Sequence, residues 1–106
     1  MSYRFMRVIV FFDLPTETKA QRREYTHFRK KLLKSGFLMM QESVYSKLAL
    51  NATTAEIIRR GIISESPPEG IVQLMIVTEK QYNAIEYVTG SANNTTLSTD
   101  ERLVIL

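Results

Sequence analysis

The feature that most constrains the fold is the stretch Arg7–Pro15, an apolar run that ends in a carboxylate. The residues from Val8 to Phe12 are all β-branched or aromatic, which predicts a strand covered on both faces. Pro15 cannot donate to a strand ladder and biases the residue before it away from helix, so the strand should end there. Asp13 is therefore expected at the carboxyl end of a buried central strand, facing a cleft.

The two faces of this strand separate by the two-residue period of β-structure. One face carries Met6, Val8, Val10 and Phe12, and the other carries Phe5, Arg7, Ile9, Phe11 and Asp13. Both faces are largely apolar, so both need cover from other parts of the molecule.

A helix is predicted next, from about Thr18 to Ser35, because hydroxyls and an acid lie near its first turn and Gly36 follows its last. Its apolar face should hold Tyr25, Phe28, Leu32 and Leu33. Residues 37–41 and 43–50 are expected to form two strands, or one long strand broken near residues 41–43.

The second half of the chain predicts three more elements and a tail. The capping box Thr53–Glu56 predicts the start of a second helix, with Ala55, Ile58 and Ile62 on one face. Residues 71–77 predict a buried strand, residues 78–81 open a short helical turn, and residues 85–88 are expected as a short strand.

This order of elements is that of the ferredoxin-like α+β fold, a βαββαβ antiparallel sheet with its helices on one face. Residues 1–88 are predicted to form this domain, and residues 89–106 a polar linker and an extra C-terminal edge strand. The dimer prediction follows from the cover of this sheet. Two helices cover one sheet face, so the other face would show apolar side chains to water.

We therefore expect a homodimer whose interface includes Phe5, Ile9, Phe11, Leu103, Val104 and Ile105. The alternative is a monomer whose tail covers its own sheet.

The basic residues are concentrated in the first half of the chain. Residues 1–50 hold ten Lys and Arg against four Asp and Glu, a net +6, whereas residues 51–106 hold four against seven, a net −3. On the predicted helix, Lys19, Arg23, Lys30 and Lys34 share a narrow arc, while Arg22 and Arg29 flank the apolar face and should lean over the sheet. The arc is either a solvated face or a ridge that tracks phosphates, and the flanking arginines either form salt bridges or contact nucleic acid.

The sequence contains no cysteine and no apolar run of membrane-spanning length, and its first residues do not open a secretory signal. A cytoplasmic protein that does not engage a membrane is expected. Dimerisation would bring two copies of Asp13 near a two-fold axis, where a hard divalent cation with oxygen ligands fits. The alternatives are an Asp13 that caps the following turn, or one that pairs with Arg22 or Arg29.

Several motifs resemble one family, namely Phe11–Asp13, Arg22–Arg23, Phe28–Leu32, Gly36–Phe37 and Gln41–Tyr45. Their order and spacing are similar to those of the small CRISPR adaptation protein, the dimeric partner of the CRISPR integrase. The stretch Val77–Gln81 and the chain length resemble the variants that accompany type II systems.

The resemblance implies a ferredoxin-like homodimer with the C-terminal strand packed on the other protomer. It also implies an endonuclease, dependent on Mg²⁺ or Mn²⁺, that acts on RNA or double-stranded DNA, and a role in spacer acquisition in which the dimer bridges integrase dimers. The family's catalytic and metal-binding acid falls on Asp13, its basic helix positions on Arg22, Arg23 and Arg29, and its strand serine on Ser43.

One departure from the family pattern concerns the residue before the acid. Many members carry a tyrosine there, and this chain has Phe12, which should remove a hydroxyl from beside the expected metal. The alternative function is an architectural DNA-binding scaffold without a nuclease role, in which Lys19, Arg23, Lys30 and Lys34 track phosphates without reading sequence.

Overall fold

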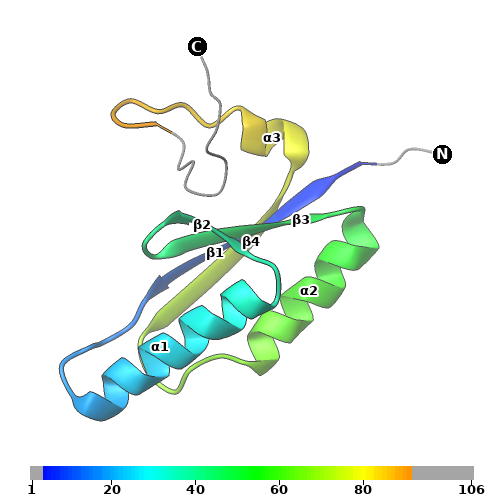
Figure 1. Ribbon diagram of the computed structural model, residues 1–106. Helices are drawn as coiled ribbons and strands as arrows, with labels where there is room; N and C mark the ends of the chain where they lie inside the picture. Colours follow the sequence, from blue (N-terminus) through cyan, green and yellow to red (C-terminus); the bar gives the residue numbers. More distant parts are fainter. Residues whose placement is uncertain (1–3, 92–106) are drawn as a thin grey trace.

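The central strand β1 (Met6–Asp13) lies between two antiparallel neighbours in a four-stranded sheet (Figure 1). The computed structural model describes residues 4–91 of the chain. The other strands are β2 (Leu38–Gln41), β3 (Val44–Ala49) and β4 (Ile71–Thr78), and the sheet order is β2-β3-β1-β4. Every pairing is antiparallel.

The helices α1 (Lys19–Lys34) and α2 (Ala52–Ser64) lie on the same side of the sheet, and the short α3 (Glu79–Asn83) follows β4 (Figure 1). The structure is α+β and ferredoxin-like, as predicted. The buried core lies between this sheet face and the two long helices. It contains Val8, Val10 and Phe12 of β1, Phe28 and Leu32 of α1, Tyr45 of β3, and Ala55 and Ile62 of α2.

The ends of α1 follow the sequence signals closely. The Thr18 hydroxyl accepts from the Gln21 backbone N–H, and the Gln21 side chain accepts from the Thr18 N–H, which completes a capping box. At the other end Gly36 adopts φ +96°, a left-handed conformation that glycine takes without steric cost. The apolar face is narrower than predicted, because Leu33 is 42% exposed.

The start predicted for α2 was wrong by two residues. The N-cap is Asn51, whose side-chain oxygen accepts from the Thr54 backbone N–H, so Thr53 lies inside the first turn. Asn is an N-cap residue at least as strong as Thr. Glu56 is not part of a capping box and forms ion pairs with Arg59 and Arg60.

Two further expectations about strands are settled. Residues 38–49 form a hairpin of two strands, with its turn at Glu42–Ser43 and a register shift between Met39 and Gln41. Residues 85–88 form no strand, and Val88 is almost fully exposed.

The helix-free face of the sheet is partly covered by α3. Arg7, on this face, forms two hydrogen bonds with the Glu79 carboxylate, from Nε to Oε1 (2.7 Å) and from Nη2 to Oε2 (3.1 Å). Its guanidinium lies 4.3 Å from the Tyr82 ring centroid, and the Ser46 hydroxyl lies 3.5 Å from the Tyr82 hydroxyl. The hydrogen bonds with Glu79 raise the pKa of Arg7.

The predicted dimer interface is less exposed in the single chain than the sequence suggested. Ile9 is 6% exposed and Phe11 is half-buried, so the expectation that both face water in a single chain was wrong. Phe5 is 50% exposed, and the exposed apolar residues of the same face are Leu38, Leu48, Ile71 and Met75. The predicted contacts of Leu103, Val104 and Ile105 lie outside the described residues.

Within residues 4–91, none of the helices is both long enough and apolar enough to cross a membrane.

Candidate functional site

Asp13 is the last residue of β1, where it pairs with Ile71 of β4 and is exposed. Strand alternation places its side chain on the helix-free face, together with Phe11. Its carboxylate forms no hydrogen bond or ion pair with another residue of the described range, including Arg22 and Arg29. The structural roles considered for Asp13, capping a turn or pairing with an arginine, are therefore not what the structure shows.

The backbone at Asp13 is held by Gly70, a residue that the sequence marked only as part of a loop. Gly70 adopts φ +92°, and a Cβ atom there would lie 2.7 Å from the Asp13 carbonyl oxygen and 2.8 Å from Leu14 Cδ2. Only glycine permits this approach without a shift of the strand end. Its position just before β4 is the signal that could have identified it.

Phe12 faces away from the acid. Its ring packs edge-to-face against Tyr25 and Phe28, with centroids 6.0 and 5.3 Å apart, and lies 5.5 Å from the Tyr45 ring. The inference that Phe12 removes a hydroxyl from beside Asp13 was wrong, because successive side chains of a strand point to opposite faces. A tyrosine at this position would direct its hydroxyl into the helix-covered core.

The basic residues do not surround Asp13. Lys19, Arg23, Lys30 and Lys34 are exposed, on the surface of α1 that faces away from the sheet. A shallow depression on this surface is lined by Lys19, Arg22, Arg23, Thr26, His27 and Lys30. The structure thus places the carboxylate and this basic ridge on different surfaces of one chain.

The two flanking arginines behave differently from each other. Arg22 is exposed and donates from Nη1 to the carbonyl oxygens of Thr16 and Glu17, both at 3.1 Å, so it does not lean over the sheet as predicted. Arg29 is half-buried and lies beside the sheet residue Tyr45, as predicted.

Ser43 lies in the turn between β2 and β3, beside the end of β1. Its carbonyl oxygen accepts from the Phe12 backbone N–H (3.0 Å), which brings this turn next to the strand end that carries Asp13. The turn also contains Glu42, an exposed acid that the sequence analysis did not single out.

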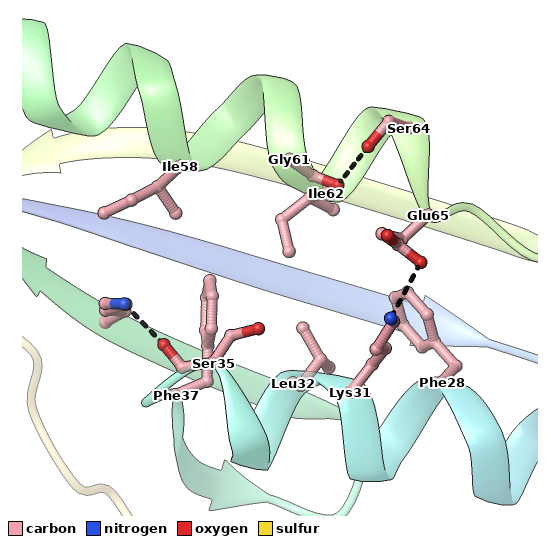
Figure 2. A pocket seen from close by; sticks show the side chains of 11 residues that line it. Phe28, Lys31, Leu32, Ser35, Phe37, Ile58, Gly61, Ile62, Ser64 and Glu65 are labelled. Carbon is pink, nitrogen blue, oxygen red and sulfur yellow. Dashed lines mark hydrogen bonds and ion pairs between the residues drawn. The ribbon is translucent and has the colours of Figure 1, made fainter.

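A cavity of about 240 Å³ lies between α1 and α2 (Figure 2). Its apolar walls include Phe28, Leu32 and Ile58, and an ion pair between Lys31 and Glu65 (3.4 Å) crosses one end. This cavity is on the helix-covered side of the sheet, so it does not include Asp13.

One chain offers few side-chain ligands for a metal ion near Asp13. No group of three or more His, Cys, Asp or Glu residues within residues 4–91 is arranged to hold an ion. Mg²⁺, however, commonly keeps several waters and takes one or two protein carboxylates. An exposed, unpaired Asp13 fits that mode, most fully when a second carboxylate comes from another copy of the chain.

Comparison with known proteins gives a consistent result. The family described as "CRISPR associated protein Cas2" matches residues 6–85. A protein of Treponema denticola named "CRISPR-associated endoribonuclease Cas2" is 54% identical over 101 residues, which cover 95% of this chain and 100% of that protein. A protein of the same name from Ligilactobacillus salivarius is 43% identical over the same share of both chains. A structure described as "Crystal structure of cas2" matches with a TM-score of 0.59 at 20% identity, covering 94% of this chain and 99% of the other, and supports the fold.

Proposed function

This chain belongs to the CRISPR-associated protein Cas2 family, and on that premise we propose that it is a homodimeric CRISPR adaptation subunit with metal-dependent endonuclease activity. The names of its relatives favour RNA as a substrate, and the family resemblance adds double-stranded DNA. In this proposal the dimer also bridges two integrase dimers during spacer acquisition.

The nuclease proposal depends on one observation, that the exposed carboxylate of Asp13 has a fixed backbone and no partner within the described chain. The residue is exposed at the end of an inner strand, its backbone is fixed by β4 and Gly70, and its carboxylate has no partner among residues 4–91. A carboxylate left free in a rigid frame is available as a metal ligand. Mg²⁺ or Mn²⁺ held there by Asp13 of each protomer would neutralise charge on a scissile phosphate and lower the pKa of a bound water.

The proposed nucleic-acid surface is the basic ridge of α1, formed by Lys19, Arg23, Lys30 and Lys34, with Arg22 and Arg29 on its flanks. The four ridge residues are exposed and, within the described range, none of them forms an ion pair. A dimer would present two such ridges. Neutralising about six phosphates in this way would lower DNA affinity by roughly 10³ between low and physiological salt.

A specific observation also favours an architectural role. The ridge and Asp13 lie on different surfaces of one chain, and no titratable side chain in the range 4–91 forms a hydrogen bond or ion pair with the carboxylate. A scaffold that binds duplex DNA with the ridge and holds integrase dimers would need no chemistry from Asp13.

Two variants separate these functions. Asp13→Asn should abolish cleavage of labelled RNA and duplex DNA in Mg²⁺ or Mn²⁺ while leaving DNA binding and the unfolding midpoint unchanged. Retained cleavage in this variant would refute the nuclease site. Spacer acquisition by Asp13→Asn in a complete system then decides the cellular role, since normal acquisition supports the scaffold.

The double variant Arg23→Glu/Lys30→Glu should weaken duplex binding at low salt and reduce the salt dependence of the affinity. Lys80→Glu, an exposed charge reversal on α3, is the matched control and should bind normally. An unchanged isotherm for the double variant would exclude the ridge as the DNA surface.

A further inference from the structure

A second pocket, of about 270 Å³, lies between α1 and the β2–β3 hairpin. It is lined by Tyr25, Thr26 and Arg29 of α1, Met39 of β2 and Glu42 of the hairpin turn. The lining therefore combines one cation, one carboxylate, a hydroxyl, an aromatic ring and an apolar side chain.

The two opposite charges of this pocket do not pair with each other. Arg29 is half-buried and Glu42 is exposed, yet neither forms an ion pair with any residue in the range 4–91. The Arg29 guanidinium lies near the Tyr45 hydroxyl but forms no well-aligned hydrogen bond with it. A half-buried guanidinium without an anionic partner carries a desolvation cost that an anionic ligand would offset. Glu42 offers acceptor oxygens across the same space.

A third unused group lies beneath the pocket. Tyr45 is fully buried, and its hydroxyl has no hydrogen-bond partner within the described chain. Tyr45 pairs with Met39 across the hairpin, and Arg29, Tyr25 and Glu42 lie close enough to influence its pKa, so the hydroxyl is surrounded by pocket residues. Burial raises the pKa of Tyr45, so the phenol keeps its proton at neutral pH and remains a donor. A buried hydroxyl without a hydrogen-bond partner destabilises the folded chain, and a ligand that accepts from it would remove that cost.

The pocket adjoins the end of the strand that carries Asp13. The turn containing Glu42 is joined to β1 by the hydrogen bond from the Phe12 N–H to the Ser43 carbonyl oxygen. The carboxylate of Asp13 is on the other sheet face, so one extended strand of nucleic acid passing this end of the sheet could contact both.

We propose that this pocket binds one nucleotide of a single-stranded nucleic acid, with its phosphate at Arg29 and the donor edge of its base at Glu42. A nucleotide carries an anionic group and a hydrogen-bond donor edge, which match the two unpaired charges. Tyr25 and Met39 supply the aromatic and apolar surface on which an unstacked base can lie. This inference deepens the proposed function and rests on it for the class of ligand.

The chemistry of Glu42 predicts which base is preferred. Guanine presents two adjacent donors, N1–H and N2–H₂, which a carboxylate can accept together. Cytosine and adenine offer an amino group next to an acceptor, and uracil offers a single N–H between two carbonyl oxygens. A bidentate contact discriminates by about 1–3 kcal/mol, so GMP should bind roughly fivefold to 150-fold more tightly than UMP.

The test uses the full-length protein and the four ribonucleoside monophosphates in calorimetric titrations. Wild type should prefer GMP over UMP, and Glu42→Gln should remove that preference. Arg29→Gln should weaken all four nucleotides to a similar extent. Tyr45→Phe should weaken binding without lowering the unfolding midpoint, which a purely structural hydroxyl would not produce. Glu86→Gln, an exposed acid outside the pocket, is the matched control and should behave as wild type.

Equal affinities for the four nucleotides, no binding, or a preference that survives in Glu42→Gln would each overturn the inference. Free glutamine carries both a carboxylate and an ammonium group, which could also match Arg29 and Glu42. If it binds as tightly as GMP, the pocket selects a zwitterion rather than a nucleotide, and the inference is overturned. Asp13→Asn separates the two proposals, because it should retain GMP preference while losing cleavage. If the wild-type protein cleaves nucleic acid but the pocket variants bind nucleotides as the wild type does, the pocket is not a nucleotide site. The nuclease proposal would then still stand.

Discussion

Gly70 shows how one residue without a side chain can define the frame of the site. Its backbone is left-handed, and a Cβ atom would overlap the carbonyl oxygen of Asp13. We predict that Gly70→Ala lowers the free energy of unfolding by about 3 kcal/mol or more, because the strain of φ and the clash with the strand end add. Urea denaturation measures this.

Gly90 provides the control for Gly70. It has a similar φ of +86°, but a Cβ there meets nothing within 4 Å. Gly90→Ala should therefore cost only the conformational strain, about 1 kcal/mol. Equal costs for the two variants would mean that the contact with Asp13 contributes nothing.

The sequence identified Asp13 but not its surroundings. A run of β-branched and aromatic residues followed by Leu14-Pro15 was enough to place the acid at a strand end. Gly70 is distant in sequence from Asp13, and so is Tyr45, whose hydroxyl the fold leaves unpartnered. Local patterns carry no information about such long-range approaches.

At the scale of elements, α3 is held on the helix-free sheet face by Arg7. The bidentate contact with Glu79 and the stacking on Tyr82 fix where the chain leaves the sheet. Arg7→Ala and Glu79→Ala should each destabilise the protein, with a coupling energy of about 1–2 kcal/mol in a double-mutant cycle. Hydrogen exchange at the α3 amides should rise in either variant. Additive effects would show that the two side chains do not stabilise each other.

Element boundaries were predictable where local signals agreed. The capping box at Thr78 predicted α3 correctly, and Thr18 and Gly36 bound α1 as expected. The apolar run of residues 71–77 predicted a strand correctly, but the expectation that this strand is buried was wrong, because β4 lies at the edge of the sheet and exposes Ile71 and Met75. The start of α2 was misplaced because two cap candidates lie two residues apart, and only the geometry selects Asn51. The predicted strand at residues 85–88 is irregular in the structure, and a short apolar run does not show whether a strand edge will pair with it.

At the scale of the whole molecule, the helix-free face is the surface proposed for dimerisation. On this face Met75, in the edge strand β4, is 46% exposed and lies directly beside Ile9 of β1. Met75→Asp should shift the protein from dimer to monomer in light scattering without unfolding it, because the side chain is already partly in water in one chain. Ile57→Asp, at an exposed position of α2, is the control and should leave the dimer intact.

The dimer was predicted because both faces of the sheet are apolar and need cover. The structure shows that a second copy is not needed for all of this cover. Part of the cover comes from α3 of the same chain, over Arg7 and Ser46. Apolar residues that remain exposed on this face, including Ile71 and Met75, are the ones that the proposed second copy would cover. A dimer that meets here would bring the two Asp13 residues toward one another.

The most direct test of the account is a subunit-mixing experiment, in which wild-type and Asp13→Asn chains are refolded together in varied ratios and metal-dependent cleavage is measured. If the two carboxylates form one shared site, activity should fall with the square of the wild-type fraction, to about one quarter in an equal mixture. A linear fall, to about one half in an equal mixture, would show that each protomer acts alone and would contradict the shared site.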